Sequence, residues 1–367
     1  MRPLRLGMVG GGTGAFIGAV HRIAARMDGR FDLVAGTLSS DAGRARTSGL
    51  ELGLAEDRIY TNFAQMAEAE AARADGIEVV SIVTPNHLHA AAAIPFLKAG
   101  IHVICDKPLT ATMADAQALA DVARTSPARF LLTHTYSGYA MVRQARAMVA
   151  AGAVGRIRVV QVEYAQDWLT EDSTSAQAMW RVDPDKAGGG AVGDIGSHAW
   201  HLLRFVTGLR ITELAADMSS MVPGRRVDDN VQAMLRLEGG ARGALWASQV
   251  APGHDNTVRI RVFGDKGGLD WTHDDPGHLW FTPFGSPRQR LVQNGPGAVQ
   301  AATQVSRVPA GHPEGYLEAF ANLYAEAARL IRTGEGDVPG LQDGLDGMAF
   351  IAACQRSSAA NGAWVTP

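Results

Sequence analysis

The fold of the first third of the chain is decided by one stretch, Leu4-Arg-Leu-Gly-Met-Val-Gly10-Gly-Gly-Thr-Gly-Ala-Phe-Ile-Gly18. An apolar run over 4–9 leads into a glycine-rich turn, and Val20, Ile23 and Met27 follow at helical spacing. A strand, a glycine turn and a helix in this order are typical of a dinucleotide site. The glycines let the backbone approach a pyrophosphate, and the helix N-terminus favours its negative charge. Gly18 comes later than the short form of this pattern places its third glycine, which predicts an enlarged loop over 13–17.

Further apolar runs over 31–38, 79–83 and 102–105 alternate with helical segments such as the alanine-rich 90–99. This alternation predicts a parallel sheet with right-handed crossovers, whose ligands bind at the carboxyl ends of the strands. The glycine turn, Thr84-Pro85-Asn86 and Asp106-Lys107 all fall at such ends, so we expect NAD or NADP to bind there. The expected cofactor contacts are Gly10, Gly12, Thr13, Ala15, Phe16, Ile17, Ser39, Ser40, Arg44, Thr84, Pro85, Asn86, His89, Asp106 and Lys107.

The second strand of the pattern bears on the choice between NAD and NADP. An acidic residue at its end binds the ribose hydroxyls of NAD, whereas an arginine suits the 2′-phosphate of NADP. Here the strand ends in Ser39-Ser40-Asp41, and Arg44 follows one turn later. Neither signature is present, and the lack of arginine at 39 or 40 favours NAD.

Beyond about residue 130, strand follows strand with short glycine turns between them. We predict an NAD(P)-binding Rossmann domain over 1–130. An α+β domain with a large, mostly antiparallel open sheet is predicted over 131–367. Helices over 194–206 and 313–333 are expected to pack against that sheet. The predicted strands of this domain are 156–165, 211–221, 230–237, 241–250, 257–263 and 267–271.

The stretch Gly188-Gly-Gly-Ala-Val-Gly-Asp194-Ile-Gly-Ser-His198-Ala-Trp-His201 carries the predicted chemistry. Asp194, His198 and His201 stand at i, i+4 and i+7, the spacing of one helical face, and Gly208 is a plausible helix stop. Each residue taken singly fits a solvated or structural role. Together with a dinucleotide site they predict hydride transfer, with His198 as the base, Lys107 on the reacting oxygen and Asp194 as an orienting group. The residues expected to bind substrate are Tyr136, Trp180, Arg181, Asp194, His198, His201 and His312, and no metal site is predicted.

Several segments resemble the Gfo/Idh/MocA family of sugar and cyclitol oxidoreductases. They are Gly18-Ala-Val-His21, Thr84-Pro-Asn-His-Leu-His89, Asp106-Lys107-Pro108 where the family usually has Glu-Lys-Pro, Gly188…His198 and Asp228-Asp229-Asn230. The resemblance covers essentially the whole chain in order. It implies roles for Lys107, Asp194 and His198 in oxidising a hydroxyl of a sugar, an anhydrosugar or an inositol. It also implies a homodimer or homotetramer joined through the sheet face.

The family often carries Asp three residues after the catalytic His, where this chain has His201. Together with Trp180-Arg181-x-Asp183-Pro184, this departure resembles a subgroup that includes levoglucosan dehydrogenase and some inositol dehydrogenases. Two other functions stay open: an NAD-dependent glycoside hydrolase on the same fold, which shows no net NADH change, and a non-catalytic dinucleotide sensor.

The length, net charge and cysteine count of the chain limit the partners and the cellular location that we expect. At 367 residues the chain is long enough for two domains, and its net charge of −3 argues against nucleic acid or an anionic membrane as partner. No signal peptide or membrane span is expected. The two cysteines, Cys105 and Cys354, are far apart and predict neither a disulfide framework nor a metal pair, so the expected location is the cytoplasm.

Overall fold

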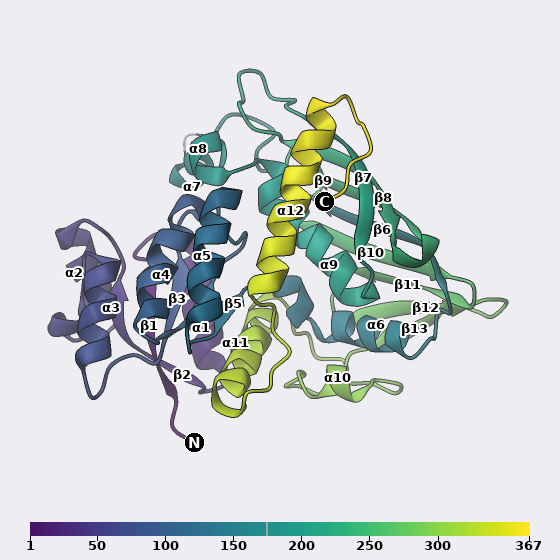
Figure 1. The fold of residues 1–367 in the computed structure, drawn as a ribbon. Helices are drawn as coiled ribbons and strands as arrows, with labels where there is room; N and C mark the ends of the chain where they lie inside the picture. Colours follow the sequence, from purple (N-terminus) through teal and green to yellow (C-terminus); the bar gives the residue numbers. More distant parts are fainter. Residues whose placement is uncertain (174) are drawn as a thin grey trace. The chain divides into compact units, whose positions relative to one another are not determined.

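A computed structural model describes residues 1–173 and 175–367. The chain forms two compact units, of which the first comprises Met1–His134 and Phe320–Leu345 and the second Thr135–Ala319 and Asp346–Pro367. The colours of Figure 1 follow the chain through both units. This division differs from the predicted one in the segment Phe320–Leu345, which was assigned to the second domain and belongs to the first unit. Its helical period was correctly expected, but such a period does not specify which sheet a helix covers.

The first unit is built on a five-stranded sheet in the order β2-β1-β3-β4-β5. Every strand pairs in parallel with its neighbours, as predicted. Strand β5 was not predicted, because three residues are too few to show a period. The strands are β1 Leu4–Gly10, β2 Phe31–Thr37, β3 Val79–Val83, β4 His102–Cys105 and β5 Phe130–Leu132. The helices are α1 Phe16–Met27, α2 Ala42–Glu51, α3 Phe63–Ala72, α4 His89–Lys98, α5 Met113–Thr125 and, from Phe320 on, α11 Tyr316–Thr333.

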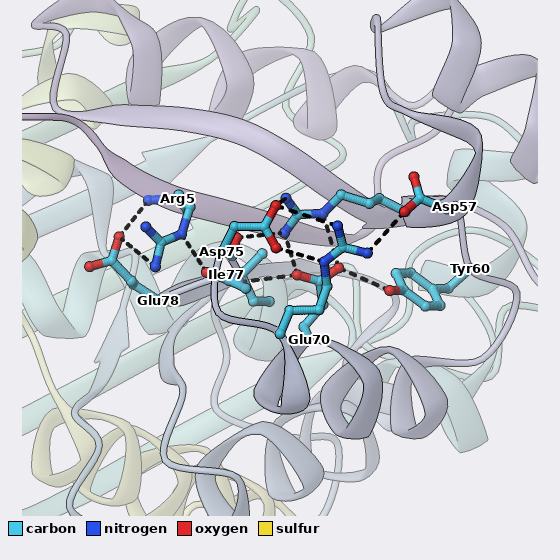
Figure 2. Close-up of polar contacts among 10 residues, drawn as sticks. Arg5, Asp57, Tyr60, Glu70, Asp75, Ile77 and Glu78 are labelled. Atoms are coloured by element: carbon cyan, nitrogen blue, oxygen red, sulfur yellow. Dashed lines mark hydrogen bonds and ion pairs between the residues drawn. The ribbon is translucent and has the colours of Figure 1, made fainter.

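A polar cluster in the first unit ties α3 to the start of β3 (Figure 2). The Glu70 side chain is fully buried, and its carboxylate pairs with the guanidinium of Arg58, which is 8% exposed. It also accepts hydrogen bonds from the hydroxyl of Tyr60 (2.9 Å) and the backbone N–H of Ile77 (3.1 Å). Burial and the bond to Glu70 raise the pKa of Tyr60 to about 12. One buried carboxylate therefore joins the 3₁₀ turn Glu56–Arg58, helix α3 and the loop that leads into β3.

The second unit is built on an eight-stranded sheet in the order β13-β12-β11-β10-β6-β9-β8-β7. The pair β6 and β9 is parallel, and the other pairs are antiparallel, which confirms the predicted mostly antiparallel sheet. Strands β12 and β13 extend the sheet beyond the predicted set. The strands are β6 Ile157–Ala165, β7 Ile211–Ser219, β8 Asn230–Leu237, β9 Arg242–Ser248, β10 Thr257–Gly264, β11 Gly267–Thr272, β12 His278–Pro283 and β13 Gln289–Val292.

Helices complete the second unit. They are α6 Ala140–Ala150, α7 Ala176–Arg181, α8 Pro184–Ala187, α9 Ser197–Thr207, α10 Gln300–Thr303 and, from Asp346 on, α12 Leu341–Ala359. The predicted helix over 194–206 is divided, because Val192–Gly196 forms a π-helical segment before α9 begins. As expected, α9 stops at Gly208, which adopts a left-handed conformation with φ of 71°. Within the described ranges, no helix is long and apolar enough to cross a membrane.

Candidate active-site residues

The glycine turn after β1 leaves no room for side chains. Gly10 and Gly11 have φ of 80° and 73°, a region that other residues rarely adopt. A Cβ on Gly12 would lie 2.7 Å from the carbonyl oxygen of Leu38, and one on Gly11 would lie 2.9 Å from the Cα of Gly18. Gly18 therefore packs α1 directly against the turn, which is the role of the third glycine of a dinucleotide fingerprint.

Of the other loop residues expected at the cofactor, Thr13 and Ile17 contact neighbouring parts of the unit, whereas Ala15 and Phe16 stand at the start of α1. The hydroxyl of Thr13 donates to the Glu51 carboxylate (2.8 Å) and pairs with the Ser48 hydroxyl, which fastens the loop to α2. Ile17 packs against the buried cluster of Met8, Leu38, Leu54 and Val83. Phe16 is 60% exposed, and α1 begins after Ala15 without a side-chain cap from the described residues. The first turn of α1 thus offers its N–H groups to an anion.

The end of β2 carries short polar side chains. The hydroxyl of Ser39 accepts a hydrogen bond from the backbone N–H of Asp41 (3.1 Å), and Ser40 is exposed. Asp41 in turn caps α2 by accepting from the N–H of Arg44 (2.8 Å), whose own side chain is exposed. No acidic side chain other than this helix cap stands within 39–44.

Two strand-end loops of the first unit are joined by His89. Its Nδ1 lies 2.8 Å from the carbonyl oxygen of Pro108 and its Nε2 lies 2.9 Å from that of Thr84, while burial lowers its pKa. This fully buried imidazole therefore supports both loops, and its contact with a cofactor stays a prediction. Asp106 accepts hydrogen bonds from the backbone N–H of Lys107 (2.8 Å) and the hydroxyl of Thr133 (3.0 Å).

The same loops contain polar groups suited to a ligand. Asn86, after Pro85, is 6% exposed. The Thr84 hydroxyl and Nδ1 of His87 are buried without a hydrogen-bond partner among the described residues. Such orphaned groups normally find a partner in water or a ligand. Together with the glycine turn, they fit a bound dinucleotide.

In the second unit, Asp194 is held by two donors on one oxygen. Its Oδ2 accepts from Nε of Arg181 (3.2 Å) and from Nε2 of Gln249 (2.9 Å). The Arg181 guanidinium also lies 4.3 Å from the ring centroid of Trp180 and 5.9 Å from that of Trp168. A cation stacked on aromatic rings and paired with a carboxylate has little freedom to rotate. The carboxylate of Asp194 is thereby fixed in orientation.

His198 lies against two tyrosines. Its ring centroid is 5.1 Å from that of Tyr136 and 6.0 Å from that of Tyr164. The Tyr136 hydroxyl donates to the Tyr164 hydroxyl (2.8 Å), which donates to Oδ1 of Asn256 (2.7 Å), and Nδ2 of Asn256 donates back to Tyr136 (3.3 Å). Burial raises the pKa of Tyr136 to about 12, so this closed ring of hydrogen bonds is made of neutral phenols.

Amide side chains extend this network. Nε2 of Gln166 donates to Oδ1 of Asn256 (2.7 Å), and Nε1 of Trp168 donates to Oε1 of Gln166 (2.9 Å). Nearby, His273 contacts the ring of Tyr136 at 5.6 Å between centroids. The second unit thus brings amides, aromatic rings, a carboxylate and an imidazole together, a set that suits a ligand rich in hydroxyl groups.

Two expected substrate contacts have different surroundings. The His201 ring is buried and lies against Trp200 and Phe205, at centroid distances of 6.2 and 5.9 Å. His312 is exposed, and its Nδ1 lies 3.2 Å from the carbonyl oxygen of Pro309. The spacing of His201 was interpreted for a continuous α-helix, but the π segment alters the register between it and Asp194.

Five residues around this site were not predicted from the sequence: Tyr164, Gln166, Gln249, Asn256 and His273. Gln166 stands just after a predicted strand, a position that could have marked it as a candidate, whereas Gln249 fell inside the predicted strand 241–250 and follows β9 as the structure has it. The remaining three come from distant segments that only strand pairing brings together. No group of metal-ligating side chains occurs within 1–173 and 175–367.

Comparisons with known proteins place the chain in a family. Residues 4–134 match the model "Oxidoreductase family, NAD-binding Rossmann fold", and residues 142–270 match the model "GFO/IDH/MocA C-terminal domain". An oxidoreductase from Sinorhizobium meliloti, solved by crystallography, is 55% identical with a TM-score of 0.93, and the match covers 100% of both chains. An inositol dehydrogenase homologue from Azotobacter vinelandii, in complex with NADH and myo-inositol, is 35% identical. Its TM-score is 0.94, and the match covers 100% of this chain and 98% of that one.

A further relative is the levoglucosan dehydrogenase of Pseudarthrobacter phenanthrenivorans. It is 30% identical over 54% of this chain and 56% of its own length. The first unit is thus an NAD-binding Rossmann domain, as its glycine turn predicted. The chain belongs to the Gfo/Idh/MocA family of oxidoreductases.

Proposed function

We propose that this oxidoreductase is a dehydrogenase that transfers hydride between a nicotinamide cofactor and a secondary hydroxyl of a sugar, an anhydrosugar or an inositol. One observation carries the substrate class: Asp194 and His198 stand four residues apart within a dense set of amide, phenol and indole groups. Polyhydroxylated ligands are recognised by such hydrogen-bonding groups together with aromatic faces. The relatives whose names include inositol and levoglucosan support this class.

The residues of this chain have distinct proposed roles. The backbone of the Gly10–Gly12 turn and the N-terminus of α1 would hold the pyrophosphate, and Thr84 would add a hydroxyl. When bound, NAD⁺ would supply the acceptor for the hydride of the substrate carbon. His198 takes the proton of the reacting hydroxyl, because an imidazole titrates near neutral pH. The ammonium of Lys107 stabilises the alkoxide that develops on the same oxygen, and Asp194 accepts a hydrogen bond from a substrate hydroxyl.

Activity against a panel of inositols, aldoses and anhydrosugars tests this function. NADH or NADPH formation is followed at mildly alkaline pH with NAD and NADP in parallel. Steady reduction of cofactor by one class of compound, lost in the Lys107→Ala variant, is the expected result. Absence of turnover in protein that still binds NADH would reject the dehydrogenase. Release of a reducing sugar from a glycoside without net NADH would then identify the hydrolase, and no reaction at all would favour the sensor.

We also infer that the protein forms a homodimer or homotetramer through one face of the eight-stranded sheet. Val159, Met234 and Phe263 are 41%, 59% and 41% exposed and alternate with buried neighbours along β6, β8 and β10, so they share the outward face. Light scattering after size exclusion is expected to give a dimer or tetramer mass. A monomer at micromolar concentration would reject this assembly.

A further inference from the structure

Two adjacent aspartates just before β8, Asp228 and Asp229, bind different parts of the second unit. Asp228 Oδ1 accepts from the backbone N–H of Gly190 (2.8 Å), and Oδ2 accepts from that of Val192 (2.7 Å). The Asp228 carbonyl oxygen accepts from the N–H of Ala191 (2.8 Å). Three consecutive amides that precede Asp194 are therefore held by one residue.

The contact between these segments is too close for any residue but glycine at position 190. A Cβ on Gly190 would lie 1.7 Å from the carbonyl oxygen of Asp228. This close approach explains one glycine of the run before Asp194, whose function composition alone did not reveal. Asp228 also accepts a hydrogen bond from Val192, the first residue of the π segment.

The position of Asp194 follows directly from this anchor. Its backbone N–H donates to the carbonyl oxygen of Gly190 (2.9 Å), so the residue that Asp228 holds also starts the turn that carries Asp194. The side chain of Asp194 is held at Oδ2 by Gln249. The N–H of Gln249 donates to the carbonyl oxygen of Asp229 (2.8 Å), and its side chain is 2% exposed. The backbone and the carboxylate of Asp194 are thus both linked by hydrogen bonds to the two aspartates that precede β8, the backbone through Gly190 and the carboxylate through Gln249.

We propose that Asp228 and Gln249 are positioning residues for Asp194, with Asp228 holding the backbone of the π segment and Gln249 the carboxylate oxygen. This inference rests on the proposed function, in which Asp194 contacts the substrate. Neither residue needs to touch substrate or cofactor for its loss to slow the reaction. A small displacement of an orienting carboxylate is enough to reduce turnover substantially.

Asp229 provides a matched control. It accepts from two backbone amides, those of Met221 (2.8 Å) and Val222 (3.0 Å), and from the guanidinium of Arg225 (3.2 Å). It is fully buried and adjacent to Asp228, but its side chain holds the turn over 221–225 and not the segment before Asp194. Exchange of Asp229 for Asn leaves the carbonyl bond to Gln249 in place.

The test compares Asp228→Asn, Asp229→Asn and Gln249→Leu in the full chain. Asn places an NH₂ group against one of the two amides, so each Asp→Asn variant loses one backbone hydrogen bond. With the substrate identified by the panel, Asp228→Asn and Gln249→Leu are expected to lower kcat by about 10-fold or more. Their KM for NAD should stay within about 2-fold, because the affected hydrogen bonds lie in the second unit and the glycine turn belongs to the first. Asp229→Asn should lower the melting temperature and keep kcat per folded enzyme within about 2-fold.

Hydrogen exchange supplies a readout that does not depend on activity. Peptides covering Gly188–Ser197 should exchange faster in Asp228→Asn than in wild type or Asp229→Asn. Equal exchange in all three, or a kcat of Asp228→Asn equal to that of wild type, would overturn the positioning role. An equal loss of kcat in Asp229→Asn would also overturn it. Wild-type protein without polyol activity would reject the proposed function instead, and exchange would still decide whether Asp228 holds the segment. If Asp228→Asn does not fold, Gln249→Leu with unchanged kcat would reject the proposal.

Discussion

Acidification is expected to destabilise the first unit through one buried histidine, His21 on α1. Its ring is fully buried, with Nδ1 2.9 Å from the Tyr324 hydroxyl and 3.3 Å from the Ser81 hydroxyl, and with the Phe320 ring 5.0 Å away. Its Nε2 has no hydrogen-bond partner among the described residues. Because burial penalises the charged imidazolium, the pKa of His21 is lowered to about 4.

The size of this loss in the free energy of unfolding follows from proton linkage. An unfolded histidine has a pKa of about 6.5, so between pH 6.5 and 4 the unfolded chain binds a proton that the folded unit does not. The free energy of unfolding therefore falls as the pH falls. With these two pKa values the loss is about 2 kcal/mol between pH 7 and 5, and about 3.4 kcal/mol once the pH is below both. Above pH 6.5 the contribution is fully present.

The matched variant is His21→Phe, which keeps a ring of similar size and leaves Ser81 and Tyr324 hydrogen-bonded to each other at 2.9 Å. Urea unfolding is measured at pH 7, 6 and 5, with hydrogen exchange in β1 and β3 reporting on the first unit. The wild type should lose about 2 kcal/mol more than His21→Phe between pH 7 and 5. His312→Gln, a change at an exposed site, should follow the wild type. Parallel pH dependence in wild type and His21→Phe would refute the argument.

Four further substitutions test the site and the fold. Lys107→Ala should lower kcat by about 10²–10³ with little change in NADH affinity measured by fluorescence, and unchanged turnover would remove Lys107 from the mechanism. His198→Asn should lower kcat by about 10²–10⁴ and abolish the neutral inflection of the pH–rate profile, so a retained inflection would exclude His198 as the base. Ser39→Asp should increase the NAD-over-NADP ratio of kcat/KM, because a carboxylate repels a 2′-phosphate; an unchanged ratio would place the ribose elsewhere. Glu70→Gln should cost about 3–5 kcal/mol in urea unfolding by leaving buried Arg58 with the exposed Asp75 carboxylate at 3.7 Å as its ion-pair partner, and a cost under about 1 kcal/mol would contradict this role.

The alternation of strands and helices in the first unit and its glycine turn were predictable because they depend on local patterns. Apolar runs and positive φ at Gly10 and Gly11 are properties of neighbouring residues. The π segment was not predictable in this way. The spacing of Asp194, His198 and His201 matches a continuous α-helix equally well, and only the anchor at Asp228 shows where the backbone widens.

The residues around the second-unit site were missed for a different reason. Gln249 lies 55 residues after Asp194, and Asn256 lies 120 residues after Tyr136. Contacts over such separations depend on strand register, which composition and periodicity leave open. The predicted domain division assigned Phe320–Leu345 to the second domain, whereas the structure groups this segment with the first unit. An amphipathic pattern identifies the buried face of a helix, but not the sheet against which that face packs.

The topology of the second sheet explains why these distant residues meet. Strands β6 and β9 are the parallel pair of an otherwise antiparallel sheet, so their carboxyl ends lie at the same edge. The N–H of Gln166 donates to the carbonyl oxygen of Ser248 (2.8 Å), which continues the pairing just beyond both strands. Gln166 and Gln249 are thereby brought to one edge, the first in contact with the Tyr136 network and the second with Asp194. An antiparallel pairing of β6 and β9 would place the two amides at opposite edges, and the network that holds Asp194 and the one beside His198 would have no common support.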